Sequence, residues 1–136
     1  MTPRYMLDTN ICIYLMKHHP PEVAKRFAEC YFGDVAISSI TLAELEYGVV
    51  CSGESQQHNR DALSALLEDI VVMPFDVSAA SRYGVVRMAT RERKRDAIDK
   101  LIAAHAIALD ATLVTNNEGD FTMYPGIKIE NWVASH

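Results

Sequence analysis

The sequence of 136 residues lacks any apolar run long enough to cross a membrane. Its N-terminus also lacks the basic region, long apolar segment and small-residue cleavage site of a secretory signal, so we expect a cytoplasmic protein. No internal repeat, low-complexity segment or linker interrupts the chain, and 49% of its residues are hydrophobic. That share is enough to bury a substantial core. These features predict one globular domain that spans residues 1–136.

Cysteine is scarce in the chain. There are only three cysteines, Cys12, Cys30 and Cys51, an odd number without CxxC spacing. This pattern suggests neither a disulfide framework nor a zinc site, and we expect reduced thiols that are mostly buried. The sequence also lacks a Ser/His/Asp or Cys/His arrangement, so it gives no ground for proposing a covalent nucleophile.

Basic residues are fewer than acidic ones, and the net charge is −5. This charge argues against a protein that coats nucleic acid non-specifically. The basic residues are nevertheless unevenly placed, since seven of the thirteen lie between Arg82 and Lys100. The dense run RERKRD contains Arg91, Arg93, Lys94 and Arg95. Such a run is usually a solvated helix end. It gains a functional meaning only if an anionic ligand docks nearby.

Short apolar runs alternate with longer periodic segments along the chain, and these patterns predict strands and helices respectively. The expected strands cover residues 5–7, 34–38, 70–75, 111–116 and 126–132. The expected helices cover residues 10–17, 22–32, 39–50, 56–69, 76–93 and 96–110. This order is typical of an α/β domain with a mostly parallel central sheet.

Acidic residues recur near the ends of the expected strands. Asp8 directly follows the first strand, Glu44 lies in the helix after the second, and Asp120 lies just beyond the fourth. Asp99 lies in the first turns of its helix and joins them if that helix begins at the same edge. In parallel α/β sheets, ligands bind outside the carboxyl ends of the strands. The four acids are therefore candidates for one site, although Asp8 is equally an ordinary N-cap for the helix that follows it.

Carboxylates that converge in one crevice repel one another unless a cation neutralises them. Mg²⁺ and Mn²⁺ prefer oxygen ligands, keep bound waters and activate water for attack on a phosphodiester. The constellation of acids therefore suggests metal-assisted phosphoryl chemistry.

The helix SITLAELEYGVV offers two acids, and its periodicity does not choose between them. Apolar residues lie on two of its sides, so we expect it to be packed on both, and either Glu44 or Glu46 could be the buried acid. Ser38, Ser39 and Thr41 are candidate caps, and Thr41 followed by Glu44 fits the capping-box spacing.

Several blocks of the sequence together resemble one family. These are YMLDTNICIYLMK at the start, ISSITLAELEYGV in the middle, and DKLIAAHAIALDATLVTNN and DFTMYPGIKIENW towards the end. In this order and spacing they resemble the PIN-domain toxins of the VapC family, from VapBC toxin–antitoxin systems. The resemblance implies a three-layer α/β/α sandwich and a Mg²⁺- or Mn²⁺-dependent endoribonuclease.

The resemblance also implies roles for individual residues. It makes Asp8, Glu44 and Asp99 metal ligands, and so chooses Glu44 over Glu46. The fourth position corresponds to Asn117 or Asp120, of which only Asp120 is charged. The neighbouring polar residues, expected to orient carboxylates or waters, are Thr9, Asn10, Thr115 and Asn116.

Two further residues lie close to Asp99 in the sequence. Asp96 stands where many relatives have a Gly/Pro-rich turn, and we interpret it as a helix cap rather than an outer metal contact. His105 is a tempting general base, but it lies about 240° around the helix from Asp99. We expect it to be a packed histidine that hydrogen-bonds the backbone or a neighbour.

The family resemblance further implies partners. It implies a homodimer that a VapB-type antitoxin holds inactive within a toxin–antitoxin hetero-oligomer. The antitoxin's C-terminal segment would lie in an apolar groove and extend a basic side chain towards the acids. Operator DNA would be bound only through the antitoxin, and no membrane is involved. The substrate would be a structured RNA such as tRNA, whose cleavage inhibits translation.

The basic run RERKRD is our candidate for holding the phosphates of that RNA. Two other functions remain open. A phosphotransferase with Asp8 as nucleophile fits poorly, because Asn10 stands where a second aspartate is expected. An inactive binding module, whose acidic pocket only receives a basic antitoxin segment, is the stronger alternative.

Overall fold

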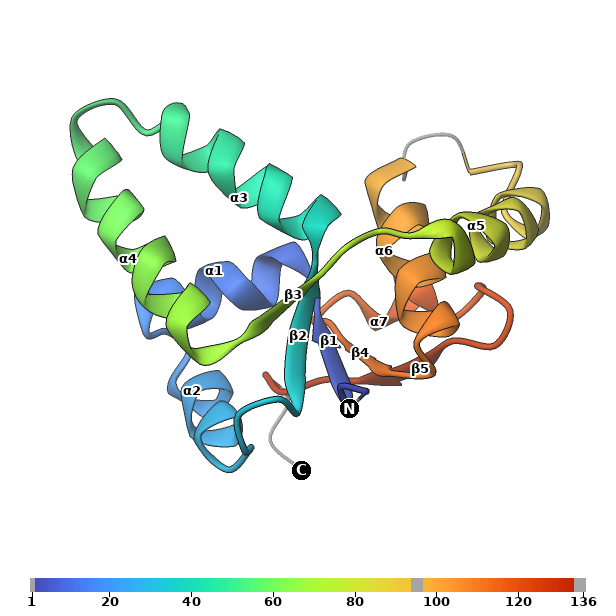
Figure 1. The fold of residues 1–136 in the computed structure, drawn as a ribbon, viewed down its shortest axis with the longest axis horizontal. Helices are drawn as coiled ribbons and strands as arrows, with labels where there is room; N and C mark the ends of the chain where they lie inside the picture. The colour runs from blue at the N-terminus through green and yellow to red at the C-terminus, as the bar shows by residue number, and fades with distance from the viewer. Residues whose placement is uncertain (1, 94–96, 134–136) are drawn as a thin grey trace.

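The computed structural model describes residues 2–93 and 97–133, which are built around one five-stranded sheet (Figure 1). Its strands are β1 (Tyr5–Leu7), β2 (Val35–Ser38), β3 (Val71–Met73), β4 (Thr112–Val114) and β5 (Lys128–Glu130). The strand order is β3-β2-β1-β4-β5, and every pairing is parallel. The sequence prediction of a mostly parallel sheet is confirmed.

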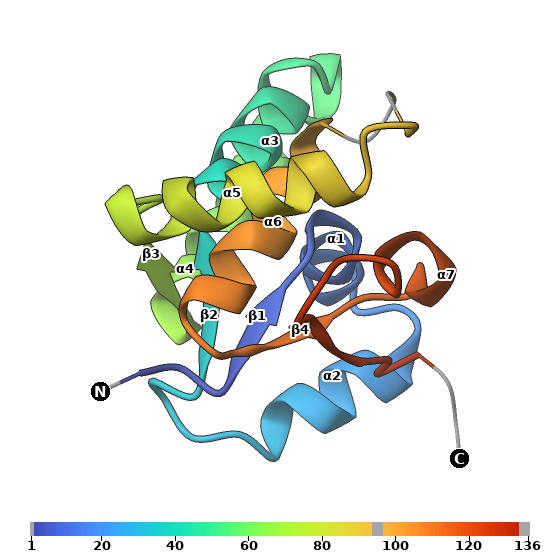
Figure 2. The same cartoon turned by 90° about the vertical axis from the view of Figure 1, so that its right-hand side faces the viewer.

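Helices cover both faces of this sheet. The first group, on the left of Figure 1, comprises α1 (Thr9–Lys17), α2 (Pro21–Ala28), α3 (Ser39–Val50) and α4 (Gln56–Asp69), with a short 3₁₀ turn at Gly53–Ser55. The second group comprises α5 (Val77–Ala89), α6 (Ala97–Ala108) and the short α7 (Glu118–Phe121). Figure 2 shows α5 and α6 crossing in front of the sheet. The result is the expected three-layer α/β/α sandwich.

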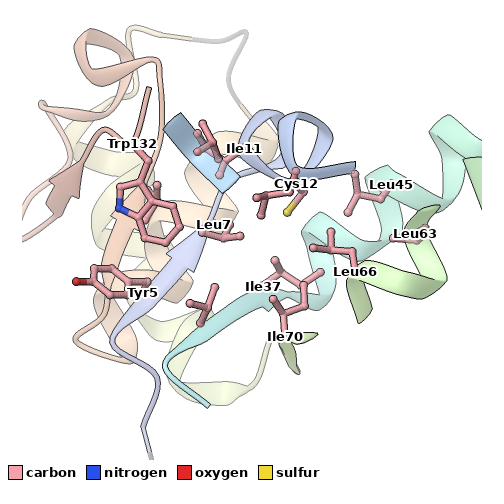
Figure 3. Packing of buried hydrophobic residues seen from close by; sticks show 14 of the residues in the cluster. Tyr5, Leu7, Ile11, Cys12, Ile37, Leu45, Leu63, Leu66, Ile70 and Trp132 are labelled. Carbon is pink, nitrogen blue, oxygen red and sulfur yellow. The ribbon is translucent and has the colours of Figure 1, made fainter. Parts of the chain in front are cut away.

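Strand β1 separates two apolar cores, because successive side chains of a strand point to opposite faces. Tyr5 and Leu7 join the core beneath α1 to α4, which Figure 3 shows. Met6 joins the second core, with α5, α6 and α7. All three side chains are buried, which explains why the run reads as continuously apolar rather than alternating.

The chain reverses its direction of travel across the sheet next to β1. It passes from β1 to β2 and β3 on one side, and later returns to β4, which pairs with β1 on the other side. Such a switch point opens a crevice at the carboxyl ends of the two strands. Asp8 follows β1 and Thr115 follows β4, so both residues lie at this point.

Local caps explain where the helices begin. Ser38 caps α3 by accepting a hydrogen bond from the Ile40 amide at 3.1 Å, and Asp76 caps α5 by accepting from the Ala79 amide at 3.0 Å. The Thr41–Glu44 capping box does not form. Thr41 is instead buried on the inner face of α3, and Ser38 provides the cap.

Three helices end earlier than expected, and one of them is α6, which ends at Ala108 instead of residue 110. Helix α2 ends at Ala28 instead of residue 32, because the amides of Glu29 and Cys30 turn back to carbonyls of the last helical turn. Helix α5 ends at Ala89, so the basic run follows the helix rather than extending it. The structure also contains α7, which the sequence did not predict.

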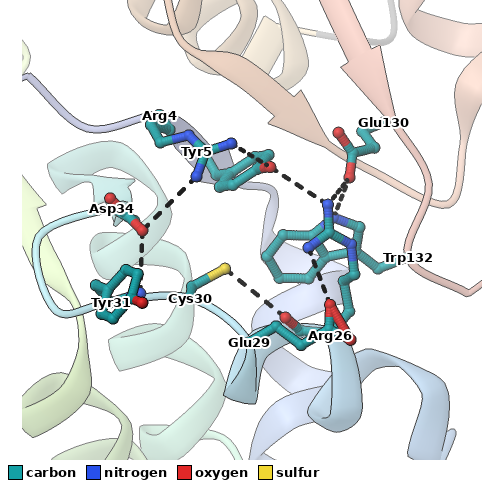
Figure 4. Close-up of polar contacts among 9 residues, drawn as sticks. All are labelled: Arg4, Tyr5, Arg26, Glu29, Cys30, Tyr31, Asp34, Glu130 and Trp132. Atoms are coloured by element: carbon teal, nitrogen blue, oxygen red, sulfur yellow. Dashed lines mark hydrogen bonds and ion pairs between the residues drawn. The ribbon is translucent and has the colours of Figure 1, made fainter.

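A cross-link of polar and aromatic side chains ties the C-terminal segment to α2 and β1 (Figure 4). The Arg26 guanidinium contacts the Glu130 carboxylate at 2.8 Å and stacks over the Tyr5 and Trp132 rings. The Trp132 indole N–H donates to the same carboxylate at 2.9 Å. These contacts explain how β5 is held at the edge of the sheet.

Part of the apolar surface is not covered within the chain. Contrary to the sequence expectation, one apolar side of α3 is open, with Tyr47 72% and Val50 62% exposed. Helix α5 likewise exposes Val85 and Met88.

Within the described residues, no helix combines the length and apolar character that a bilayer crossing requires. The cysteines are free, but only Cys12 is buried, so the expectation of mostly buried thiols was wrong.

Candidate active site

Asp8 lies at the centre of the candidate site, where β1 ends and α1 begins. Its Oδ1 accepts a hydrogen bond from the Ile11 amide at 2.9 Å, and its own amide donates to the Val114 carbonyl at 3.0 Å. The residue is only 4% exposed. Asp8 therefore caps α1, as its simpler interpretation predicted, and also holds a buried carboxylate at the switch point of the sheet.

Burial raises the pKa of the Asp8 carboxyl above its usual value, because removal from water penalises the charged form. Hydrogen bonds from the Thr115 hydroxyl and from the amides of Ile11 and Asn10 oppose this shift. The negative charge of Glu44 adds to it. Asp8 and Glu44 are thus close enough to repel each other, and a cation between them would relieve both the burial penalty and the repulsion.

Glu44 projects from α3 and is half-buried. Its Oε1 accepts a hydrogen bond of 2.6 Å from the hydroxyl of Thr9, the residue that follows Asp8. Glu46 instead forms an ion pair with Arg60 of α4. The structure therefore puts Glu44, and not Glu46, on the side of Asp8.

Asp99 lies in the first turn of α6 and is half-buried. Because α6 ends just before β4 begins, its first turn must lie on the side where β4 ends, and Figure 1 shows α6 beginning there. Asp99 is thus on the same edge of the sheet as Asp8. Asp96 lies outside the described residues.

A buried hydrogen bond links α6 to the start of α3. His105 Nδ1 lies 2.8 Å from Ser38 Oγ, and the imidazole packs edge-on against the Phe75 ring. Burial lowers the pKa of His105, and the negative charge of Asp76 partly opposes this. The prediction of a packed histidine is confirmed. The bond joins the helix of Glu44 to the helix of Asp99.

Asp120 lies in α7 and is paired with a cation of the same chain. The Arg93 guanidinium donates to the Asp120 carbonyl at 2.9 Å and lies 3.4 Å from its carboxylate.

Asn117 is exposed, and its backbone amide donates to the Thr115 hydroxyl. Asn116 accepts from the Asn131 amide group at 3.2 Å. Asn116 is therefore engaged by the segment after β5.

The basic run has two described members that bind the protein itself. Arg91 is exposed, and its guanidinium donates to the Met88 carbonyl at the end of α5. Arg93 reaches α7, as described above. Lys94 and Arg95 lie outside the described residues. Arg91 thus matches the helix-end interpretation, while Arg93 extends to the candidate site.

Lys100 is a residue whose role the sequence did not indicate. It was counted in the basic stretch, yet it is only 6% exposed. Its ammonium donates to the Thr90 carbonyl at 3.0 Å and to the Arg93 carbonyl. The available signal was its position, because Lys100 directly follows Asp99 in an otherwise apolar helix.

A groove of about 750 Å³ opens beside Glu44, between α1, α3 and α4. Thr9 and Glu44 line one part of it, and apolar side chains line much of the rest. The apolar lining includes Ile13, Met16, Leu45, Val49 and Ala62. The groove therefore joins Glu44 to a largely apolar surface.

The oxygen ligands around Asp8 suit a divalent cation that keeps some of its bound waters. Within residues 2–93 and 97–133, no three His, Cys, Asp or Glu side chains are arranged to hold a metal ion directly. Mg²⁺ does not require such a cage, since it commonly uses one or two carboxylates and keeps several waters. The buried oxygen of Asp8, with Glu44 nearby, fits that mode. The assignment of Asp8, Glu44, Asp99 and Asp120 as ligands stays a prediction.

Comparison with known proteins gives consistent matches over nearly the whole chain. Residues 5–125 match the PIN domain. Ribonuclease VapC2 of Rickettsia felis is 42% identical over 132 residues, which cover 94% of this chain and 97% of the relative. The tRNA(fMet)-specific endonuclease VapC of Shigella flexneri is 36% identical over 131 residues, or 95% and 98% of the two chains. The DNA-bound VapBC structure from Salmonella typhimurium superposes with a TM-score of 0.87 at 35% identity, over 96% and 98% of the chains.

A parallel α/β/α sandwich with acids at its switch point defines the class of PIN-domain nucleases, whose members generally depend on a divalent metal. Within that class, the chain belongs to the VapC family of toxin–antitoxin ribonucleases. The resemblance inferred from the sequence blocks is confirmed, as is the fold that it implied.

Proposed function

We propose that the chain is a Mg²⁺- or Mn²⁺-dependent endoribonuclease whose centre is formed by Asp8, Glu44, Asp99 and Asp120. The observation that carries this proposal is the buried Asp8 carboxylate, whose pKa is raised by burial and further by Glu44. A cation bound beside it would offset both the burial penalty and the repulsion from Glu44. The proposal treats residues 1–136 as a single PIN domain.

The reaction is hydrolysis of an RNA phosphodiester, in which water adds to phosphorus and the bond to one ribose oxygen breaks. When bound, the divalent ion supplies positive charge for the phosphate and lowers the pKa of water. Asp8 and Glu44 hold it, while Thr9 orients Glu44 and Thr115 orients Asp8 through their hydroxyl groups. Asp99 and Asp120 would act from α6 and α7, directly or through water.

The proposed substrate is a structured RNA such as a tRNA, cleaved in the cytoplasm with inhibition of translation. The Shigella relative is named for tRNA(fMet), which supports the class of substrate. An exposed loop suits an acidic edge better than a closed duplex, because its nucleotides can be splayed out. With a net charge of −5, phosphate contacts must be local, and Arg91 and Arg93 with Lys94 and Arg95 remain the candidates.

The proposed inhibitor is a VapB-type antitoxin, consistent with the VapBC complexes among the similar structures. We assign its C-terminal segment to the groove beside Glu44. A basic side chain at that end would neutralise the acids and obstruct RNA. Operator DNA would then be bound through the antitoxin.

The proposed homodimer would use the exposed apolar faces of α3 and α5. Figures 1 and 2 both show these helices on the upper side of the molecule, where the strands end. Tyr47 and Val50 on α3, with Val85 and Met88 on α5, are the residues available for the contact.

Cleavage of total tRNA by the purified protein tests the proposed function. We expect cleavage only with Mg²⁺ or Mn²⁺ present, and a loss of about 100-fold or more in Asp8→Asn, Glu44→Gln and Asp99→Asn. Glu68→Gln, at an exposed position on α4, is the matched control and should cleave normally. Full activity of Asp99→Asn would refute the site assignment. A wild type that binds antitoxin but never cleaves RNA would favour the inactive binding module.

A further inference from the structure

The segment of residues 90–93, which follows α5, is anchored by a buried lysine. The Lys100 ammonium donates to the Thr90 carbonyl at 3.0 Å and to the Arg93 carbonyl. Thr90 is the C-cap of α5, so the ammonium also lies at the negative end of that helix. A cation 94% buried by its own fold is costly unless it is well bonded, and these carbonyls provide that bonding.

The anchored segment carries Arg93, whose backbone is fixed at two points. Its amide donates to the Thr90 carbonyl at 2.9 Å, and its carbonyl accepts from Lys100. Its guanidinium then reaches α7, where it binds both the carbonyl and the carboxylate of Asp120. A continuous set of contacts therefore runs from Lys100, the neighbour of Asp99, to Asp120.

We propose that Lys100 is a positioning residue for the metal site, which holds Arg93 against Asp120 and thereby sets the affinity of the site for a divalent cation. The inference rests on the proposed function, since it takes Asp120 as part of the metal site. Arg93 places a positive charge at Asp120, so a divalent cation drawn to Asp120 must compete with this ion pair. Lys100 acts on that competition only through Arg93.

Titration of Mn²⁺ into the purified protein, followed by calorimetry, tests this inference without relying on RNA cleavage. Arg93→Gln should raise Mn²⁺ affinity about two- to fivefold, the range expected for a partly exposed ion pair. Lys100→Met, which keeps the length of the side chain but removes the donor, should raise it by the same factor. The double variant should bind Mn²⁺ no more tightly than either single variant, because both changes remove one contact.

Lys128→Met is the matched control. Lys128 also donates to a backbone carbonyl, that of Asp110. It is the first residue of β5 and pairs with the first residue of β4, so it lies at the amino ends of these strands. Its replacement should leave Mn²⁺ affinity unchanged. If Lys100→Met does not fold, Lys100→Gln is the second variant. Its donor is neutral and one bond shorter, so it should weaken the contact with the Arg93 carbonyl and raise the Mn²⁺ affinity in the same direction by a smaller factor.

The outcomes are distinct. Unchanged Mn²⁺ affinity in a folded Lys100 variant, together with lowered stability, would show that Lys100 only supports the fold. If the fold-increase in Mn²⁺ affinity of the double variant equals the product of the two single fold-increases, Lys100 acts by its own charge and not through Arg93. Either result overturns the inference and leaves the proposed function intact, provided that the wild type binds Mn²⁺ and Asp8→Asn does not. A wild type that takes up no Mn²⁺ would refute both.

Discussion

Asp8 combines two roles that the sequence presented as alternatives. Its Oδ1 caps α1 through the Ile11 amide, and its buried carboxylate lies beside Glu44. An asparagine would cap the helix equally well, so capping alone does not require the charge. Burial makes the charge less favourable in the folded protein than in water, as expected if Asp8 has the proposed role in binding a cation.

Asp8→Asn should therefore stabilise the metal-free protein, by about 1 kcal/mol at pH 7. The pKa of Asp8 is raised in the folded state, so its carboxylate carries no penalty below the usual pKa of 3.8, and the penalty grows as pH rises through the folded pKa. The advantage of Asp8→Asn should accordingly be small at pH 4 and full at pH 7. Urea unfolding in EDTA measures this, with Glu68→Gln as the control for lost charge. An Asp8→Asn protein that is less stable than the wild type at pH 7 would show that its buried charge is already compensated.

At the scale of helices and strands, the sequence predicted the elements that begin at a proline or a capping side chain. Pro21 opens α2, Ser38 caps α3 and Asp76 caps α5, and the strands between them are short apolar runs. The differences include α7, which has only four residues, and the early end of α2. Neither carries a periodic signal that distinguishes it from a loop.

The candidate site was predictable only in part, for a related reason. Acids that follow strands are placed by topology, so Asp8 could be assigned to the carboxyl edge from the element order. Asp99 could be placed there only on the condition that its helix begins at the same edge. The contact of Arg93 with Asp120 spans 27 positions along the chain and depends on how α7 packs. The buried anchor at Lys100 likewise depends on where α5 ends. Such contacts leave no trace in local composition.

The bond between Ser38 and His105 links two acid-bearing helices and should make stability depend on pH. Burial lowers the pKa of His105 below 6.5, so its contribution is complete above pH 6.5 and is lost as pH falls towards the folded pKa. His105→Gln should destabilise the protein by about 1–2 kcal/mol at pH 7 and flatten the stability profile between pH 7 and 5. Chemical denaturation across that range measures both effects. Exposed His58→Gln is the control, and an unchanged profile in His105→Gln would mean that other groups cause the pH dependence.

At the scale of the whole molecule, the candidate functional residues lie towards one edge of the sheet. The carboxyl ends of β1 and β4, the first turn of α6 and the groove between α1, α3 and α4 all meet the candidate acids there. The Arg26, Glu130 and Trp132 cross-link ties the edge strand β5 to α2. The exposed apolar faces of α3 and α5 lie on the functional side, so dimerisation and inhibition would both act next to the metal.

The central claim is that a divalent cation binds at Asp8, and an anomalous-difference map from crystals soaked in Mn²⁺ tests it most directly. We expect one dominant peak, about 2.0–2.4 Å from an Asp8 carboxylate oxygen and on the side that faces Glu44 and Asp99. Crystals of Asp8→Asn, soaked identically, should lack that peak. A dominant peak elsewhere with none at Asp8, or a peak that persists unchanged in Asp8→Asn, would contradict the account.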